Sequence, residues 1–226
     1  MKQTFLSFMK SLRRHWMAIV DSLLPNRYYS QFGEDRFLAD DISVEERFSG
    51  VYIDIGGNHP SRISNTYHFY RLGSSGVLVE PNPIFDRLYR CYRPRDVHLK
   101  IGIGSQPGLM PFYDNGSTSV SGFIPASAKL PPQAFFPILS LDSLLSILDS
   151  KEVYLLSIDV EGMDAEVLMS GPKLLQRVRR VIVEFGENFE KIDELLTRHG
   201  LTMVHRNATN GIYKRLEPVD SMRKES

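Results

Sequence analysis

Two short segments of the chain place ligand-binding residue types at the end of an apolar strand pattern. Residues 51–55 (VYIDI) lead into the glycine-rich turn at residues 56–58, and residues 77–79 lead into Glu80. Glycines let the backbone approach a ligand closely, and a carboxylate at a strand end can accept hydrogen bonds from ribose hydroxyls. Since ligands of open α/β sheets bind beyond the carboxyl ends of the strands, the two segments predict a site for a molecule that carries a nucleoside.

The glycine-rich turn lacks the features of a loop that holds pyrophosphate. A dinucleotide fingerprint needs Gly-x-Gly-x-x-Gly opening into a helix, whereas Gly56 and Gly57 are adjacent and His59-Pro60 follows them. The predicted ligand is therefore a nucleoside without a phosphate cradle, and S-adenosylmethionine is the common cofactor of that kind. The alternatives are that the glycines form only a turn and that Glu80 caps a helix or lies on the surface.

Acidic residues follow two further strand patterns. Asp159 and Glu161 come directly after residues 153–158, and Glu184 ends residues 181–184. Such carboxylates can orient a substrate hydroxyl, remove its proton or hold a divalent cation, for which these three residues are the candidate ligands. The alternative is that Asp159 and Glu161 cap the next helix and interact with its dipole.

Strand patterns alternate with helix patterns through most of the chain, which predicts a mostly parallel sheet with helices on both faces. Residues 201–205 and 211–214 form a predicted hairpin that adds an antiparallel strand. The other predicted strands are residues 51–55, 77–80, 97–103, 153–158 and 181–184, and the predicted helices are a first one that ends near residue 41, then residues 64–72, 83–92, 141–148, 165–169 and 189–199.

Residues 106–137 are the least regular part of the chain and contain six prolines. An irregular segment of this length within a compact domain is typical of a functional or mobile loop. We predict a substrate-side insertion with a short hairpin of residues 110–113 and 122–125, in which Tyr113 and Ser117 contact the substrate.

Composition limits the class of protein. A length of 226 residues fits one α/β domain, and a formal net charge of zero gives no global reason to expect nucleic acid as a partner. The single cysteine, Cys91, cannot form an internal disulfide, which favours a reducing compartment such as the cytoplasm. No apolar run is long enough to cross a bilayer.

Residues 1–24 carry apolar side chains at helical spacing with four Lys or Arg residues between them. A basic amphipathic helix of this kind can lie on an anionic membrane surface, contact a partner or pack on its own domain, and all three alternatives stay open. We therefore divide the chain into an amino-terminal helix (residues 1–29), a central domain (residues 30–216) and a polar tail (residues 217–226).

Five motifs follow one another along the chain: SQFGED at residues 30–35, YIDIGGNHP at 52–60, SNT at 64–66, EPN at 80–82 and SIDVEG at 157–162. In this combination the chain resembles the FkbM family of S-adenosylmethionine-dependent methyltransferases over roughly residues 29–216. The resemblance implies the class I methyltransferase fold, a Rossmann-like three-layer α/β sandwich whose mostly parallel seven-stranded sheet has an antiparallel last strand. It also implies O-methylation of sugars, glycans or secondary metabolites.

The resemblance further implies roles for residues at matching positions. Asp54, Gly56 and Asn58 would line the methionine part of the cofactor, and Glu80 would bind its ribose. Gly57 stands where many members have alanine, and His59-Pro60 stands where many have a glycine-containing turn. The predicted cofactor residues are Asp54, Gly56, Gly57, Asn58, Asn65, Thr66, Glu80, Pro81, Asn82 and Asp159, with Asp159 and Glu161 as catalytic residues and Tyr113, Ser117 and Glu184 at the substrate.

The expected function is S-adenosylmethionine-dependent O-methylation of a sugar hydroxyl in a glycan or glycosylated metabolite. The alternative is a non-catalytic methyltransferase-fold module that docks to a membrane or a partner. The enzyme would act in the cytoplasm, with peripheral membrane contact through residues 1–24 as one alternative. A nucleotide-dependent oxidoreductase or epimerase is disfavoured because the pyrophosphate loop is missing.

Overall fold

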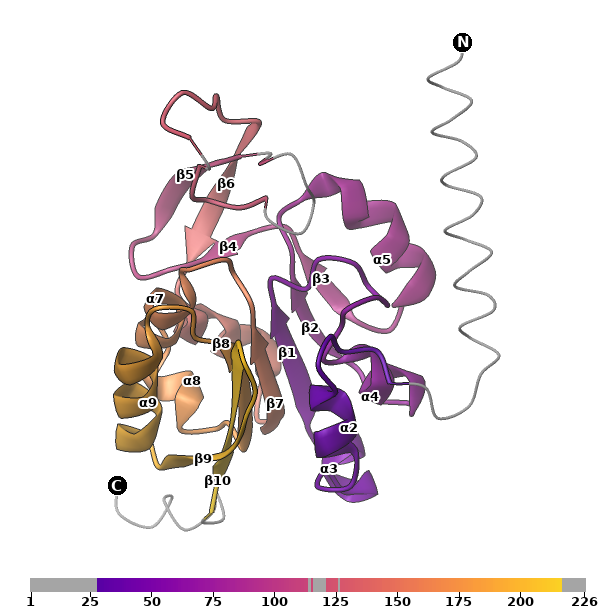
Figure 1. Cartoon of the computed structure of the whole chain (residues 1–226). Helices are drawn as coiled ribbons and strands as arrows, with labels where there is room; N and C mark the ends of the chain where they lie inside the picture. The colour runs from indigo at the N-terminus through magenta and orange to yellow at the C-terminus, as the bar shows by residue number, and fades with distance from the viewer. Residues whose placement is uncertain (1–27, 114, 116–120, 126, 217–226) are drawn as a thin grey trace.

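The computed structural model describes residues 28–113, 115, 121–125 and 127–216 (Figure 1). The predictions for residues 1–24, for Ser117 and for the polar tail therefore lie outside the described residues. Within the described part, no helix is long and apolar enough to cross a membrane.

The main sheet has seven strands in the order β3-β2-β1-β7-β8-β10-β9. All neighbours are parallel except β10, which is antiparallel to both β8 and β9, so the predicted fold class is confirmed. The carboxyl ends of β1, β2, β7 and β8 meet at one edge, called the carboxyl edge below, and the opposite edge is the amino edge. The strands are β1 (Val51–Ile55), β2 (Gly76–Val79), β3 (Val97–Leu99), β7 (Val153–Ile158), β8 (Arg180–Glu184), β9 (Leu201–Arg206) and β10 (Asn210–Arg215).

Alternation along the strands divides the interior into two clusters. Val51, Ile53 and Ile55 of β1 belong to an aliphatic cluster, whereas Tyr52 belongs to a second cluster rich in aromatic rings. Successive side chains of a strand point to opposite faces, so the sheet buries apolar groups on both sides. By the same alternation Asp54 lies on the aromatic side, and its place near the end of β1 puts it at the carboxyl edge.

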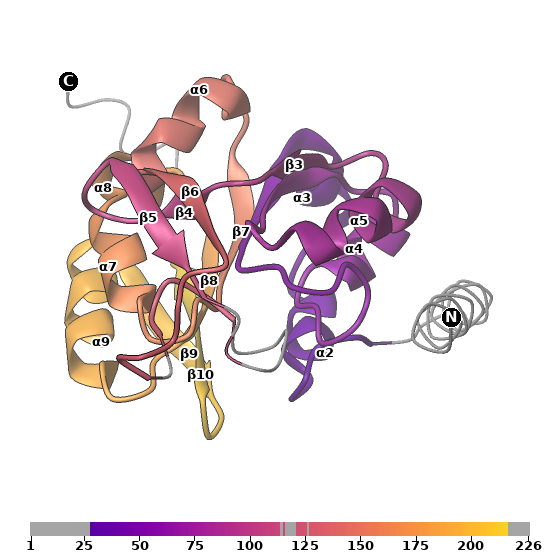
Figure 2. The ribbon, with the colours of Figure 1, turned by 90° about the horizontal axis from the view of Figure 1, so that it is seen from above.

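Different helices cover the two faces (Figure 2). The aliphatic side receives the carboxyl-terminal helices and the aromatic side receives those near the amino terminus. The first group comprises η2 (Leu141–Leu144), α6 (Leu145–Leu148), α7 (Asp164–Met169), α8 (Pro172–Leu175) and α9 (Phe189–Arg198), and the second comprises α2 (Glu34–Ala39), α4 (Tyr67–Arg71), η1 (Pro83–Phe85) and α5 (Asp86–Tyr92).

The irregular insertion contains a separate three-stranded sheet, which corrects two predictions. Residues 97–103 form β3 in the main sheet and β4 (Gly102–Ile103) in the small one, because the chain leaves the main sheet between them. The predicted hairpin of residues 110–113 and 122–125 is only a bridge between Tyr113 and Gly122. The real partner of β5 (Gly108–Phe112) is β6 (Ala134–Leu139), whose strand pattern is broken by Pro137.

Two helices were not predicted, α3 (Val44–Ser49) and α8. A capping box starts α3, since Ser43 accepts from the backbone N–H of Glu46 while the Glu46 side chain accepts from that of Ser43. Helix α4 begins three residues later than predicted. The backbone N–H of Ser64 bonds the carbonyl of Tyr29 instead, which holds the preceding residues in a loop.

Candidate active site

The turn after β1 packs tightly against Asp159, the residue that follows β7. Gly56 has φ 78°, and a Cβ at this position would lie 1.9 Å from the backbone oxygen of Asp159. The backbone N–H of Asp159 in turn bonds the carbonyl of Ile55 at 3.0 Å. Glycine is therefore required by both conformation and space, and the β1 turn and Asp159 are held in contact.

Tyr89 on α5 fixes the second glycine. A Cβ at Gly57 would lie 2.7 Å from the Tyr89 hydroxyl, so an alanine here would force the ring to shift. This explains in physical terms why the chain has glycine where related sequences were expected to have alanine. The hydroxyl is buried and has no hydrogen-bond partner among the described residues.

Glu80 ties the loops after β1 and β2 together. Its carboxylate accepts from the backbone N–H of Asn58 at 2.9 Å and from that of Asn82 at 2.7 Å, one bond to each oxygen. The side chain is 6% exposed. Burial, and to a lesser extent the charge of Asp54, raises the pKa of Glu80 to about 7. Each oxygen keeps a second lone pair for a ligand hydroxyl.

Asp54 is supported from below by a buried arginine that sequence reasoning missed. The Asp54 carboxylate accepts from the Thr66 hydroxyl at 2.5 Å, and Arg93 donates from both terminal nitrogens to the same hydroxyl at 3.0 Å. One Arg93 nitrogen lies 3.8 Å from Asp54. Burial raises the pKa of Asp54, while the guanidinium and the hydroxyl oppose the shift.

The other end of Arg93 is held by Asp96, at 2.7 Å from Nε. Asp96 also accepts from the Tyr52 hydroxyl at 2.7 Å and from the backbone N–H of Gly76 at 2.9 Å. Arg93 and Asp96 are three residues apart, but Tyr52 and Gly76 are distant from them in sequence, and no spacing pattern links the set. The network joins β1, β2 and α4 beneath the carboxyl edge.

Three predicted cofactor residues have structural contacts that place them behind the site. Thr66 is fully buried on Asp54 and Arg93, and the Asn82 side chain caps η1 through the backbone N–H of Ile84. Pro81 is buried beside them. Asn65 is half-buried and donates to the hydroxyl of Ser157 on β7 at 3.1 Å, so it lies close to the end of that strand.

The acidic residues after β7 form a tight turn. Glu161 has φ 54° and Gly162 has φ 94°, and both N–H groups that flank Glu161 are bonded by Asp164, Val160 at 3.1 Å and Gly162 at 3.2 Å. The residue before α7, Met163, makes no side-chain capping bond. Asp159 and Glu161 therefore do not cap α7, although both lie before its amino-terminal end, where the helix dipole acts.

Burial and neighbouring negative charges disfavour the charged forms of Asp159, Glu161 and Asp164. Desolvation and then the charge of Glu184 raise the pKa of Asp159, and the same two causes, in the same order, raise that of Glu161. Asp159 is exposed to solvent, so it is accessible to a substrate. The pKa of Asp164 is raised to about 6 by burial, with Glu184 contributing.

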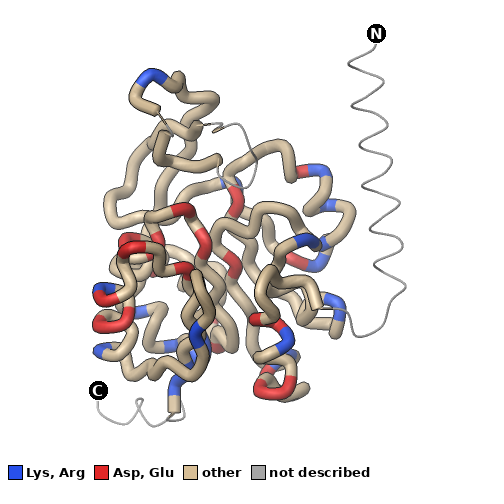
Figure 3. The backbone as a smooth tube through the Cα atoms, viewed as in Figure 1, with Lys and Arg blue, Asp and Glu red and all other residues tan. Residues whose placement is uncertain are grey.

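Figure 3 shows the acidic residues gathered at the carboxyl edge of the sheet. None of Glu80, Asp159, Glu161 and Asp164 forms an ion pair with another described residue, and the same holds for Glu184 at the end of β8. Among the described residues, no group of three or more His, Cys, Asp or Glu side chains is arranged to hold a metal ion. The candidate metal ligands Asp159, Glu161 and Glu184 thus share one edge without forming such a group.

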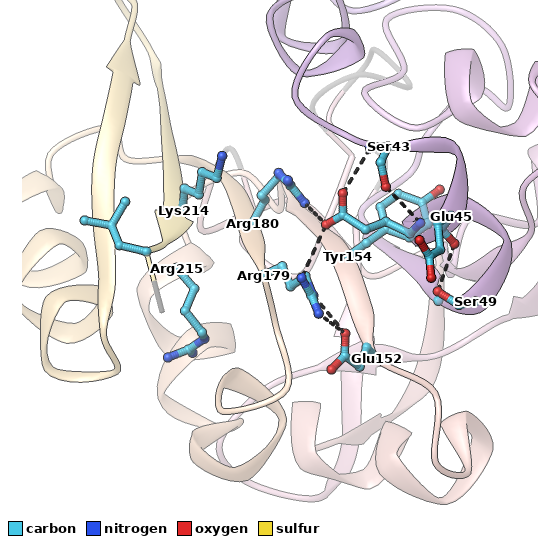
Figure 4. Close-up of a pocket in the computed structure, with 12 residues that line it drawn as sticks. Ser43, Glu45, Ser49, Glu152, Tyr154, Arg179, Arg180, Lys214 and Arg215 are labelled. Carbon is cyan, nitrogen blue, oxygen red and sulfur yellow. Dashed lines mark hydrogen bonds and ion pairs between the residues drawn. The ribbon is translucent and has the colours of Figure 1, made fainter. Parts of the chain in front are cut away.

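A cavity of about 570 Å³ lies at the amino edge, away from these acids (Figure 4). Four of its charged lining residues form two ion pairs, Arg180 with Glu46 at 2.9 Å and Arg179 with Glu152 at 2.7 Å, and Lys214 pairs with Asp41. Tyr113, the one described residue of the predicted substrate pair, is half-buried at the bridge to Gly122.

A model of the methyltransferase FkbM domain matches residues 54–203 of the chain. No curated protein matches the chain. Among solved structures, the methyltransferase FkbM from Methylobacillus flagellatus KT is 10% identical with a TM-score of 0.49, over 74% of this chain and 43% of that one. The TehB-like SAM-dependent methyltransferase from Corynebacterium glutamicum ATCC 13032 Kitasato is 13% identical with a TM-score of 0.43, over 92% and 98%.

The chain thus spans less than half the length of the Methylobacillus structure that it matches. The family model, in contrast, covers more than half of the chain and includes the β1 turn, the β2 end and the acids after β7 and β8. The chain therefore belongs to the FkbM family of S-adenosylmethionine-dependent methyltransferases.

Proposed function

We propose that the chain transfers the methyl group of S-adenosylmethionine to a sugar hydroxyl of a glycan or glycosylated metabolite, as in polysaccharide biosynthesis. The observation that carries the proposal is that Glu80 and the acids after β7 and β8 have no cationic partner among the described residues, next to a glycine-rich turn. A ligand with ammonium and sulfonium groups lowers the cost of ionising these acids, whereas a phosphate would raise it. Family membership supports the same cofactor.

Residues of the first two loops fit the nucleoside and the amino acid of that cofactor. Glu80 offers its free lone pairs to the ribose hydroxyls, while its bonds to Asn58 and Asn82 hold the loops in place. Asp54 and the Gly56 turn line the methionine part, where the buried carboxylate complements an ammonium group. The bound cofactor supplies an activated methyl group on its sulfonium.

Asp159 is the proposed base. A neutral sugar hydroxyl is a weak nucleophile, so a group that accepts its proton during transfer is needed. The raised pKa of Asp159 brings its proton affinity closer to neutral pH, where a general base works best. Glu161 and Glu184 stand beside it as candidates to orient the hydroxyl. A divalent cation stays a secondary alternative for these three acids.

Calorimetry with S-adenosylmethionine, followed by transfer of its labelled methyl group to cell extracts, tests the proposal. We expect binding in the micromolar range or tighter and label in sugars released from a glycan extract. Extracts of small metabolites and of protein serve as comparison acceptors. Label that appears only in protein or nucleic acid would exclude a sugar acceptor, and absence of cofactor binding would favour the non-catalytic module.

A further inference from the structure

The motif at residues 30–35 plays no part in the cofactor site, yet it builds a rigid turn. Gly33 has φ 86°, and Glu34 next to it is 1% exposed. The Glu34 carboxylate accepts from the side-chain amides of Asn207 at 2.8 Å and Asn210 at 2.6 Å, and from the backbone N–H of Phe32 at 3.0 Å. Although burial acts to raise the pKa of Glu34, these hydrogen bonds lower it.

A second buried acid closes the other half of the turn. Asp35 is fully buried and accepts from the backbone N–H of Tyr29 at 2.5 Å, from the Ser30 hydroxyl at 2.6 Å and from the backbone N–H of Arg36 at 2.9 Å. Charge-assisted hydrogen bonds of this kind are strong and directional. The carboxylates of Glu34 and Asp35 thus both hold the turn in its shape through hydrogen bonds.

The turn runs along the carboxyl edge from β1 to β8. At one end, the Tyr29 carbonyl accepts from the backbone N–H of Ser64, whose neighbour Asn65 reaches β7. At the other end, Asn210, bonded by Glu34, is paired in register with Glu184. Figure 2 shows α2, which follows the turn, beside the strands that carry the acids. The turn is therefore held between the loop after β1 and the strand residue that pairs with Glu184, at the carboxyl edge of the sheet.

This rigid frame presents side chains to solvent. Gln31 is exposed and Phe32 is 47% exposed, without a ring partner among the described residues. Ile63, directly before Ser64, is 63% exposed and has φ 50°. A β-branched residue in the left-handed region is strained, and such strain persists where the surroundings enforce it, often at ligand sites.

We infer that Gln31, Phe32 and Ile63 form a subsite for a sugar ring of the acceptor, an inference that rests on the proposed function. An aromatic ring offers a flat apolar surface for the C–H face of a pyranose, and the Gln31 amide can donate to and accept from its hydroxyls. The exposed Ile63 side chain extends the apolar surface. A preformed subsite of this kind loses little conformational entropy when it binds.

Phe37 provides a matched control because it is a phenylalanine on α2, the helix that begins directly after the turn, and is 42% exposed. Its ring, however, stacks on His205 with centroids 4.6 Å apart, so it already has a partner. Truncation of either phenylalanine removes a similar exposed ring. Only Phe32 belongs to the inferred subsite.

The experiment measures the rate of methyl-label transfer from S-adenosylmethionine to acid-released sugars over a dilution series of glycan extract. Phe32→Ala is expected to raise the apparent KM for the extract about tenfold, which corresponds to ~1.4 kcal/mol. Gln31→Ala should act in the same direction, Phe32→Tyr should restore the wild-type KM, and Phe37→Ala should leave it within about twofold. Cofactor affinity and melting temperature should not change in any of these variants.

An unchanged KM in Phe32→Ala would overturn the subsite while leaving the proposed function intact. Equal losses in Phe32→Ala and Phe37→Ala, or a parallel loss of cofactor affinity, would assign Phe32 a structural role and overturn the inference as well. No label in sugars from the wild-type protein would overturn the proposed function and the subsite together.

Discussion

The acidic residues at the two edges of the sheet have pKa values that are shifted in opposite directions. At the amino edge, burial acts to raise the pKa of Asp41 and of Glu46, but Lys214 and Arg180 lower that of Asp41 and Arg180 lowers that of Glu46. At the carboxyl edge, burial raises the pKa values of Glu80 to about 7 and of Asp164 to about 6. Similar side chains thus stabilise the fold at one edge and carry an energetic cost at the other.

This difference in the pairing of acids indicates which edge of the sheet carries the function. Acids paired with arginine contribute to folding, and Asp54 at the carboxyl edge shares this support because Arg93 lies 3.8 Å away. Acids buried without a cation destabilise the protein unless a ligand or a reaction uses them. The cavity at the amino edge is thus less informative about activity than the unpaired acids opposite it, even though it is well formed (Figure 4).

Asp159→Asn should have the largest effect on activity. The asparagine amide keeps the shape of the carboxylate but cannot take the proton from the hydroxyl of the acceptor, so kcat should fall by roughly 10²–10⁴-fold. Cofactor affinity should change little, because the proposed role of Asp159 is at the methyl group and the acceptor. Steady-state kinetics and calorimetry on the same preparation check both statements. A kcat equal to that of the wild type would exclude Asp159 as the base.

Glu80→Ala should weaken cofactor binding by tenfold or more. The substitution removes hydrogen bonds to a charged group, each worth about 1.5–3 kcal/mol, and releases the Asn58 and Asn82 N–H groups. Calorimetry with S-adenosylmethionine measures the change. If the variant binds the cofactor as tightly as the wild type, the ribose is bound elsewhere.

Two buried arginines allow a direct test of the edge comparison. Arg93 is 2% exposed beneath the carboxyl edge, and Arg180 is 4% exposed at the amino edge. Replacing either by methionine breaks buried ion pairs, which typically costs about 3–5 kcal/mol of stability. Only Arg93→Met should also weaken the cofactor, because Asp54 loses its neighbouring cation and protonates more readily.

Melting temperatures and cofactor affinities of the two variants separate these effects. Arg93→Lys, which keeps the charge but not the fork of donors, should recover part of the affinity. An equal loss of cofactor affinity in Arg93→Met and Arg180→Met would show that both act through stability alone.

The strands at the centre of this comparison could be predicted, but the network beneath them could not. Residues 51–55 and 153–158 are apolar runs with β-branched side chains, so local pattern alone identifies β1 and β7. The link between Arg180 and Asp41 joins residues 139 positions apart, and that between Arg93 and Thr66 spans 27. Such contacts depend on the assembled fold, and single-sequence patterns carry no trace of them.

The acids at the strand ends were found because their position after a strand is itself a local signal. Asn82 lies after β2 and Thr66 belongs to the SNT motif of the family resemblance; both are predicted to bind the cofactor, and both side chains also form bonds within the protein. Strand β6 (Ala134–Leu139) was not predicted because Pro137 breaks its strand pattern. In the structure the proline lies within the strand, which pairs with β5 through its other residues.

The apoprotein should lose stability as pH rises from about 4.5 to 7. The folded pKa of Glu80, about 7, lies above its ordinary value of 4.5, so the folded state holds a proton that the unfolded chain releases first. Asp41 and Glu46 have lowered pKa values, so their contribution is present above their ordinary values and is lost only at lower pH. Urea unfolding at pH 5, 6 and 7 measures the slope. Glu80→Gln should flatten it, and an identical slope in that variant would remove Glu80 as the cause.

Deletion of residues 1–24 should have the smallest effect on the two edges. These residues lie outside the described part of the chain, and their basic amphipathic pattern leads us to propose contact with an anionic membrane surface. The shortened chain should then keep its cofactor affinity and melt within about 2 °C of the full chain, which corresponds to at most about 1 kcal/mol. It should also lose binding to vesicles that contain phosphatidylserine, while neither form binds vesicles of phosphatidylcholine alone. A fall in melting temperature of more than about 5 °C would show that the segment packs on its own domain, because a shift of that size reflects more than 1 kcal/mol of lost contacts.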